Sequence, residues 1–201
     1  MRTIIIGASG YGREVAWICR RAGIELLGFC DDSPDKQAGT MAEYPLLGTI
    51  EAAAARLDGP LGFHVAVGDN RARQQLAARA LQVGWQAVTV VDPSAVCAPD
   101  ADLGAGCLVG IGSVISCGTR LGGFVIVNHH VTVGHDCDIA EAAQLCPGVR
   151  VSGGCRIGEG ALLGSNAATI PGVAIGAWAT VGAGGVALRD LPAGERLVRI
   201  R

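Results

Sequence analysis

Aromatic residues are scarce in this chain: three Trp, two Tyr and three Phe make up 4% of its 201 residues. A conventional core takes much of its packing area from aromatic side chains, so a stack of small, regular units fits this composition better. Lysine is rarer still, with Lys36 as the only one, and no basic run accompanies the net charge of −2. Nucleic acid and anionic membranes are therefore not expected as partners.

Long apolar runs and paired cysteines are also missing. No segment is long enough to span a membrane, and the N-terminal MRTIIIGASG holds an apolar run of only three residues, too short for a signal peptide. The eight cysteines form no CxxC pair, which excludes a zinc ribbon and a thioredoxin motif. We expect a soluble cytoplasmic protein whose Cys107, Cys137 and Cys155 are core residues.

What the chain does contain is a six-residue repeat from Leu103 to Ala187. Every sixth residue is Leu, Ile or Val in thirteen of fifteen cases, and the residue two positions earlier is always small or β-branched. A period of six is typical of a parallel β-helix, in which three hexads complete one triangular coil of about eighteen residues. Both residue types then point inward, and the glycine that often follows the aliphatic residue lets the chain turn. An antiparallel sandwich would instead alternate by two.

The residues before this repeat alternate between strands and helices. The pattern predicts strands over 2–6, 25–30, 63–67 and 86–91 and helices over 13–22, 49–57 and 71–83. This order indicates a small parallel sheet flanked by helices. We therefore expect two domains, a Rossmann-like α/β domain at residues 1–91 and a β-helix at residues 92–201.

A glycine-rich turn follows the first predicted strand, with Gly7, Gly10 and Gly12 in the sequence GASGYG. Backbone N–H groups at such a turn, beside a helix N-terminus, suit a phosphate, and Asp31 and Asp32 follow at the distance where a carboxylate meets a ribose or base. An NAD-dependent oxidoreductase is one interpretation. The GxxGxG spacing and a sheet of under 90 residues favour a mononucleotide site instead.

Polar residues capable of proton transfer gather in one part of the β-helix, at Asn128-His129-His130 and at His135-Asp136. His135 lies two residues past the inward Val133, so it is expected at a corner, with Gly153 at the same corner one coil later. A carboxylate beside an imidazole fixes its tautomer and raises its basicity. A solvated pair of surface histidines is the alternative interpretation.

The chain resembles the sialic-acid O-acetyltransferase and nucleotide-4-amino-sugar N-acetyltransferase family of bacterial left-handed β-helix acyltransferases. The resemblance covers nearly the whole length, and VGHDC is its most specific segment. The segments that carry it are IIIGASGYGREV at 4–15, DD at 31–32, VGDNRARQ at 67–74, VDPSA at 91–95, VNHHVTVGHDC at 127–137 and IPGVAIGAWATVGAGGVALRDLP at 170–192.

The resemblance implies an acetyl-CoA-dependent enzyme that forms a homotrimer with active sites between subunits. It implies His135 as the catalytic base and Asp136 as the residue that orients it. The implied contacts to the nucleotide-sugar are Gly7, Gly10, Asp31, Asp32, Gly68, Asp69, Asn70 and Asn128. The implied contacts to acetyl-CoA are Gly153, through its backbone N–H, and Gln144, Gly164, Gly182 and Ala183.

The predicted reaction is direct N-acetylation of a nucleotide-linked amino sugar of the 4-amino-4,6-dideoxy class, without a metal and for a bacterial surface glycan. O-acetylation of a sialic-acid-like sugar is the alternative. A zinc hydratase of the β-helix carbonic anhydrase type is less favoured, because His130 and His135 have the right spacing but no third histidine lies two coils earlier. A purely structural role is disfavoured because a scaffold has no use for a polar corner.

Overall fold

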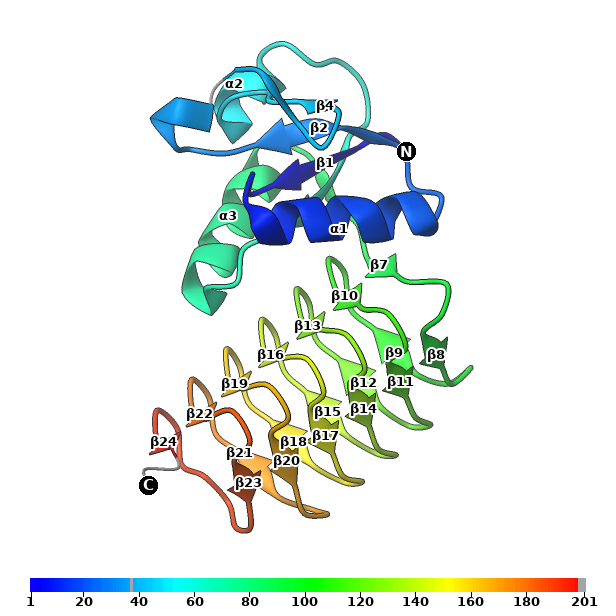
Figure 1. The fold of residues 1–201 in the computed structure, drawn as a ribbon, viewed down its shortest axis with the longest axis vertical. Helices are drawn as coiled ribbons and strands as arrows, with labels where there is room; N and C mark the ends of the chain where they lie inside the picture. Colours follow the sequence, from blue (N-terminus) through cyan, green and yellow to red (C-terminus); the bar gives the residue numbers. More distant parts are fainter. Residues whose placement is uncertain (37, 199–201) are drawn as a thin grey trace. The chain divides into compact units, whose positions relative to one another are not determined.

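The computed structural model describes residues 1–36 and 38–198, and the chain divides into two compact units, Met1–Val90 and Val91–Arg201. The first unit is built from helices and a parallel sheet, and the second from a regular succession of very short strands (Figure 1). The predicted fold class, a small α/β domain followed by a parallel β-helix, is confirmed.

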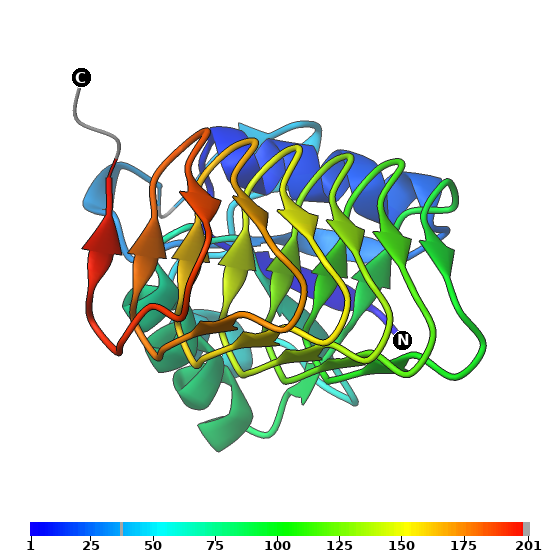
Figure 2. The same cartoon turned by 90° about the horizontal axis from the view of Figure 1, so that it is seen from below.

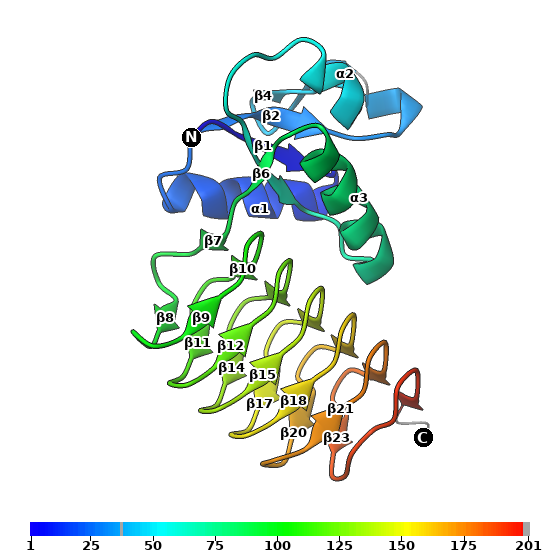
Figure 3. The same ribbon diagram turned by 180° about the vertical axis from the view of Figure 1, so that it is seen from behind.

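A four-stranded parallel sheet forms the centre of the first unit, in the order β2–β1–β5–β6. Figure 3 labels β2, β1 and β6 of this sheet. Because β1 and β5 are parallel neighbours, the turn after one and the loop after the other lie at the same edge of the sheet. The elements of this unit are β1 (Thr3–Ile6), α1 (Gly10–Arg21), β2 (Leu26–Cys30), a 3₁₀ turn (Pro34–Lys36), β3 (Thr40–Met41), β4 (Tyr44–Pro45), α2 (Ile50–Ala54), β5 (Gly62–Val65), α3 (Asn70–Gln82) and β6 (Gln86–Ala87).

Helix α1 begins three residues earlier than its apolar pattern predicts. Ser9 is its N-cap, and the Ser9 side chain accepts a hydrogen bond from the Gly12 N–H at 3.3 Å. A cap side chain supplies a partner that the first turn of a helix otherwise lacks, so the helix can start inside the glycine-rich turn. Val15 and Ile18 then form part of the buried face.

The second unit is a left-handed β-helix whose strands form three parallel sheets. We call the sheets first, second and third in chain order. The first contains β7 (Val90–Val91), β10 (Leu108–Val109), β13 (Ile126–Val127), β16 (Gln144–Leu145), β19 (Leu162–Leu163), β22 (Thr180–Val181) and β24 (Arg196–Leu197). The second contains β8 (Val96–Cys97), β11 (Val114–Ile115), β14 (Thr132–Val133), β17 (Arg150–Val151), β20 (Ala168–Thr169) and β23 (Val186–Ala187). The third contains β9 (Asp102–Leu103), β12 (Arg120–Leu121), β15 (Asp138–Ile139), β18 (Arg156–Ile157) and β21 (Ala174–Ile175).

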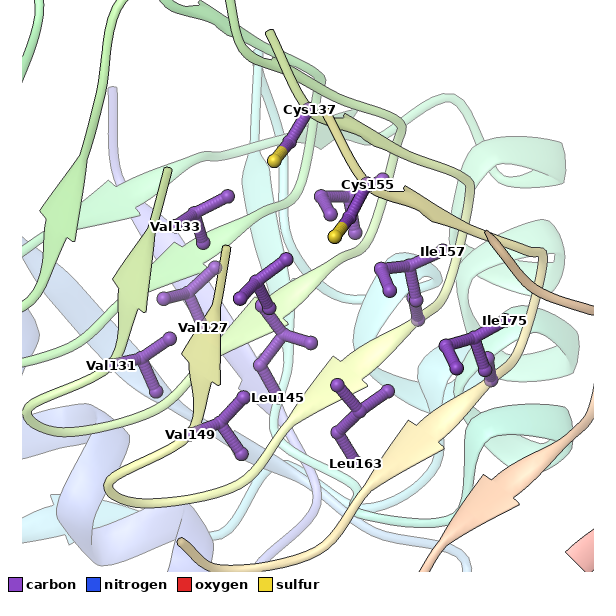
Figure 4. Packing of buried hydrophobic residues seen from close by; sticks show 14 of the residues in the cluster. Val127, Val131, Val133, Cys137, Leu145, Val149, Cys155, Ile157, Leu163 and Ile175 are labelled. Carbon is purple, nitrogen blue, oxygen red and sulfur yellow. The ribbon is translucent and has the colours of Figure 1, made fainter. Parts of the chain in front are cut away.

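The core of the β-helix consists of columns of equivalent side chains from successive coils. Figure 2 shows the coils following one another, and Figure 4 shows Val127, Leu145 and Leu163 as one such column. The small-residue positions are equally buried: Cys137 is 2% exposed and Cys155 is fully buried. Both predicted inward positions are therefore confirmed. Equivalent residues of successive coils stack on one another, so an inserted residue would move every later side chain out of its column, which explains why the repeat contains no insertion.

The repeat extends beyond the stretch in which it is obvious. Val91 and Cys97 lie in register with Leu103 and pack against the same core, so coiling starts before the first clear hexad. At the other end Ile175 pairs with Leu191 and Val181 with Leu197. The paired residues of this last coil are sixteen residues apart, two fewer than the eighteen of the earlier coils. The strict six-residue period therefore stops after Ala187.

The glycine after each aliphatic residue serves close packing more than turning. A Cβ at Gly104 would lie 2.6 Å from the Gly122 carbonyl carbon, so the next coil leaves no room for a side chain. The left-handed backbone comes two residues later, at positions such as Gly106 and Gly118, and some of these positions carry a side chain instead, as in Asp136 with a φ of 55°.

Candidate active site

His135 and Asp136 lie at the second corner of the β-helix, which joins the second sheet to the third. His135 Nδ1 lies 2.8 Å from Asp136 Oδ2, and the two side chains are 65% and 74% exposed. An ionised carboxylate only accepts hydrogen bonds, so this contact places the ring proton on Nδ1 and leaves the Nε2 lone pair bare. The pair is thus an oriented imidazole that can accept a proton from a ligand.

Gly153 is the residue against which the His135 ring packs. A Cβ at Gly153 would lie 2.5 Å from His135 Nε2, so any side chain there would displace the ring. The Gly153 N–H makes no hydrogen bond within the described part of the chain. A bare ring nitrogen and a free N–H donor therefore lie next to each other, which is the arrangement that acyl transfer requires of a base and an oxyanion donor.

The other predicted β-helix residues lie in other parts of the β-helix. Asn128, Gly164, Gly182 and Ala183 are at the first corner, between the first and second sheets, and Gln144 is in β16. They are separated from His135 by the width of the second sheet. Within one chain the structure therefore brings together only His135, Asp136 and Gly153 of this set.

Several first-corner residues contact one another. The Asn128 Oδ1 accepts a hydrogen bond from the His129 N–H at 2.7 Å, and a Cβ at Gly164 would lie 2.6 Å from the Ala183 nitrogen. The Gln144 Oε1 is buried and has no hydrogen-bond partner among the described residues. A buried oxygen without a donor is costly.

The remaining histidines of the cluster also belong to the first corner. The Ile111 N–H donates to His129 Nδ1 at 3.3 Å, and Arg150 donates to the His130 carbonyl. His129 and His130 are thereby held on the coil surface and do not join the His135–Asp136 pair.

In the first unit, the glycine-rich turn packs tightly at the end of β1. Gly7 has a φ of 111°, and a Cβ there would lie 2.7 Å from the Ala66 carbonyl oxygen. Gly10 begins α1 and is exposed, so the first N–H groups of the helix are accessible. A helix N-terminus that opens from a tight turn is a common phosphate site, which fits the prediction for Gly7 and Gly10.

The Asp31 side chain, which follows β2, is hydrogen-bonded to this turn. Its Oδ2 accepts the Ala8 N–H at 2.7 Å, and its Oδ1 accepts the Ser33 N–H at 2.9 Å. Burial by itself would raise the pKa of the Asp31 carboxyl, but the hydrogen bonds from Ser33 and Ala8 and the charge of Lys36 outweigh it and lower the pKa. Both oxygens therefore already have partners in the fold.

Asp32 belongs to an ion-pair cluster that the sequence pattern did not reveal. Arg79 of α3 donates to both Asp32 oxygens, at 2.5 and 3.1 Å, and to both oxygens of Glu51 at 2.9 Å. Hydrogen bonding from Arg79 lowers the pKa of Glu51 to about 2. Arg79 could not be found from spacing, because 47 residues separate it from Asp32.

Gly68, Asp69 and Asn70 form the loop that leads from β5 into α3. Asp69 is the N-cap of α3 and its Oδ1 accepts the Ala72 N–H at 2.8 Å, while a Cβ at Gly68 would meet open space. Asn70 is the first residue of the helix.

A pocket of about 150 Å³ lies at this end of the sheet and includes two of the predicted aspartates in its wall. It is lined by Ile6, Gly7, Cys30, Asp31, Asp32, Ile50, Val67 and Leu76. Its walls are mostly apolar, and Asp31 and Asp32 are the charged residues among them.

Neither a membrane-spanning helix nor a metal cluster was found in residues 1–36 and 38–198. No helix there is long and apolar enough to cross a bilayer. In the same residues, no group of three or more His, Cys, Asp or Glu side chains is arranged to hold a metal ion.

Comparison with known proteins places the chain. The PglD N-terminal domain family matches residues 2–80. PerB from Caulobacter crescentus, solved with CoA and GDP-perosamine, is 36% identical, with a TM-score of 0.90 over 96% of this chain and 91% of that one. The acetyltransferase domain of PglB from Neisseria gonorrhoeae FA1090, solved with acetyl coenzyme A, is 32% identical, with a TM-score of 0.90 over 97% and 94% of the two chains.

A histidine-to-asparagine variant of the Caulobacter crescentus perosamine N-acetyltransferase is also similar, at 34% identity and a TM-score of 0.89 over 98% of this chain and 92% of that one. A search among curated proteins gave no match. Fold and comparisons together define a hexapeptide-repeat acyltransferase. Within that class, the chain belongs to the family of N-acetyltransferases that includes PerB and the PglB acetyltransferase domain.

Proposed function

We propose that this protein transfers the acetyl group of acetyl-CoA to the amine of a nucleotide-linked amino sugar of the 4-amino-4,6-dideoxy class. The observation that carries the proposal is the His135–Asp136 pair with the Gly153 N–H beside it. Relatives of over 30% identity that bind CoA with GDP-perosamine, or acetyl coenzyme A, support the choice of substrates. The product would serve a bacterial surface glycan.

In the proposed mechanism the sugar amine attacks the thioester carbonyl carbon while His135 Nε2 removes a proton from the amine. Asp136 stabilises the resulting imidazolium through Nδ1, and the Gly153 N–H donates to the oxyanion. When the tetrahedral intermediate collapses, the C–S bond breaks and the thiolate leaves with the proton that the imidazolium returns. The products are the acetamido sugar and CoA, and no covalent enzyme intermediate forms.

We assign the nucleotide to the first unit. Gly7 and Gly10 would present backbone N–H groups to a phosphate, and the loop at Gly68, Asp69 and Asn70 would lie at the same edge of the sheet. Asp31 and Asp32 would border the base or ribose in the 150 Å³ pocket. For Asp31 we propose that this role is indirect, because its carboxylate already holds the turn.

We further propose a homotrimer with active sites between subunits. Within one chain His135 lies at the second corner, whereas Asn128, Gly164, Gly182 and Ala183 lie at the first. A single ligand can contact both sets if the second corner of one subunit faces the first corner of another. We assign the sugar to Asn128 and acetyl-CoA to the other three with Gln144, whose buried Oε1 would then gain a donor.

The outer faces of the sheets suggest which one is covered in the trimer. On the second sheet Val96, Val114 and Val186 are 61%, 38% and 48% exposed, and Arg150 is the one charged residue in the same outward row. The third sheet carries charges at most of these positions, as in the Arg120–Asp138 ion pair of 2.7 Å. The more apolar second sheet is therefore the face that we expect to be buried between subunits.

Light scattering tests the assembly. We expect a trimer, which Val114→Arg should dissociate with loss of activity, whereas Arg156→Gln on the charged third sheet should leave both unchanged. A wild-type monomer at assay concentration would contradict both the trimer and the shared site.

Because both proposed substrates are cytoplasmic metabolites, a cytoplasmic location remains part of the proposal.

The activity itself is tested with acetyl-CoA and a panel of UDP-, GDP- and dTDP-linked 4-amino sugars, scored by thiol release and by the mass of the product. One panel member should gain a single acetyl group on its amine, and the His135→Ala protein serves as the control. Acetylation of a hydroxyl on a sialic-acid-like sugar would favour the O-acetyltransferase alternative. Absence of thiol release with every acceptor would overturn the proposal.

A further inference from the structure

Asp136 is one of the residues that carry a side chain at a left-handed corner position, with a φ of 55°. This backbone turns its side chain toward the preceding coil. There the carboxylate meets Gly118, eighteen residues earlier at the same corner: a Cβ at Gly118 would lie 2.5 Å from Asp136 Oδ1 and 3.6 Å from Asp136 Cγ. The Asp136 carboxylate thus binds His135 through Oδ2, while its Oδ1 lies close to the Cα of Gly118, where there is no side chain.

The same corner position is occupied by an aspartate two coils earlier, and the two aspartates are used differently. Asp100 Oδ2 accepts the Gly118 N–H of the next coil at 3.0 Å. The residue equivalent to Gly118 in the coil after Asp136 is Gly154, and its N–H donates to the His135 carbonyl at 2.8 Å. The Asp136 carboxylate therefore does not accept an N–H of the next coil and remains available to His135.

From this geometry we infer that Gly118 is a positioning residue for the His135–Asp136 pair. Its lack of a side chain gives the Asp136 carboxylate the space it needs to face Nδ1. The inference rests on the proposed function for its catalytic meaning. The placement of the carboxylate can be tested without the reaction.

Replacing Gly118 by alanine should move the carboxylate and leave the fold in place. The atom that a new Cβ would meet is the end of a flexible side chain, which can swing into solvent because Asp136 is 74% exposed. The left-handed φ of 63° at Gly118 adds backbone strain, so a control with the same strain is needed. Gly172 provides it: it lies three coils later at the same corner, has a φ of 75°, and has open space where its Cβ would be.

NMR of the imidazole nitrogens gives the readout that is independent of activity. In the wild-type protein His135 should carry its proton on Nδ1, and this preference for one tautomer should weaken in Gly118→Ala, as in Asp136→Asn. Gly172→Ala should keep the wild-type tautomer. If Gly118→Ala also keeps it while remaining folded, the inference is wrong, whatever the protein acetylates.

Kinetics then test whether this placement matters for transfer. We expect Gly118→Ala to lower kcat about tenfold with both KM values little changed. In an Asp136→Asn background the same change should cost less than about twofold, since its effect passes through the carboxylate. Equal losses in both backgrounds, or an equal loss in Gly172→Ala, would show a merely structural effect and overturn the inference.

Discussion

The carboxylates at the two candidate sites, one in each unit, differ in how they are held. In the first unit Asp31 accepts two backbone N–H groups, Asp32 is bound by Arg79, and Asp69 caps a helix. In the β-helix the Asp136 carboxylate is largely in solvent, lies against a glycine, and within residues 1–36 and 38–198 bonds only with the neighbouring imidazole. In the first unit side chains thus hold a backbone turn in place, whereas in the second a glycine leaves room for the two side chains to which we assign the chemistry.

Removing a reactive side chain should therefore have the largest effect, and that effect should fall on the β-helix. We expect His135→Ala to lower kcat by about 10²–10⁴ with substrate affinities little changed, because it removes the general base. Steady-state kinetics at saturating substrates measure this, with the first-corner His130→Ala as a control of small effect. Near-wild-type kcat in His135→Ala, with chemistry shown to be rate-limiting, would refute the assignment.

The second prediction separates the stabilities of the two units by pH. His64 is buried in β5 with its Nδ1 3.0 Å from the Val88 carbonyl oxygen, and burial, reinforced by the charge of Arg73, lowers its pKa to about 4. Below its ordinary pKa of about 6.5 the unfolded chain binds a proton that the folded unit refuses until about pH 4. Stability of the first unit should fall by roughly 3 kcal/mol as pH drops through that window and should be unaffected above it.

Hydrogen exchange between pH 7 and pH 4.5, corrected for intrinsic rates, locates this loss. Protection should decrease in β1 and β5 and persist in the β-helix core. His64→Asn, which cannot titrate, should flatten the difference between the units. Parallel loss of protection in both units would contradict the prediction.

The third prediction concerns the turn that Asp31 holds. Asp31→Ala removes the acceptor for the Ala8 and Ser33 N–H groups, so the KM for the nucleotide-sugar should rise about tenfold. The KM for acetyl-CoA, measured in the same assays, should hardly change. Asp31→Asn keeps one acceptor oxygen, so its KM for the nucleotide-sugar should be intermediate. An unchanged KM in Asp31→Ala would show that nucleotide-sugar binding does not depend on these hydrogen bonds.

The smallest effect is expected at Asp32. Its side chain is 49% exposed and Arg79 retains Glu51 as a partner, so Asp32→Ala should raise the nucleotide-sugar KM only about two- to threefold. A rise larger than that of Asp31→Ala would reverse the comparison and make Asp32 the direct ligand contact. Tight NAD(H) binding without nucleotide-sugar binding would bring back the oxidoreductase interpretation.

Period and spacing alone determined much of this protein. The hexads specified a β-helix, its inward columns and the corner position of His135, because stacking like on like requires one residue type at one interval. The alternation before them specified the parallel sheet, and GASGYG the tight turn at its edge to which we assign the phosphate. The apolar pattern predicts the start of α1 at Arg13, three residues after its true start at Gly10, since the Ser9 cap acts through one hydrogen bond that an apolar pattern does not register.

Other features were decided only by the tertiary structure. The period places Gly118 one coil before Asp136, but it does not say that a left-handed backbone turns the carboxylate back over that glycine. Arg79 meets Asp32 and Glu51, 47 and 28 residues away, through the packing of helices that no local pattern orients. The physical reason is common to both: a repeat fixes where a residue lies along the chain, whereas the direction of a side chain depends on neighbours that only folding brings together.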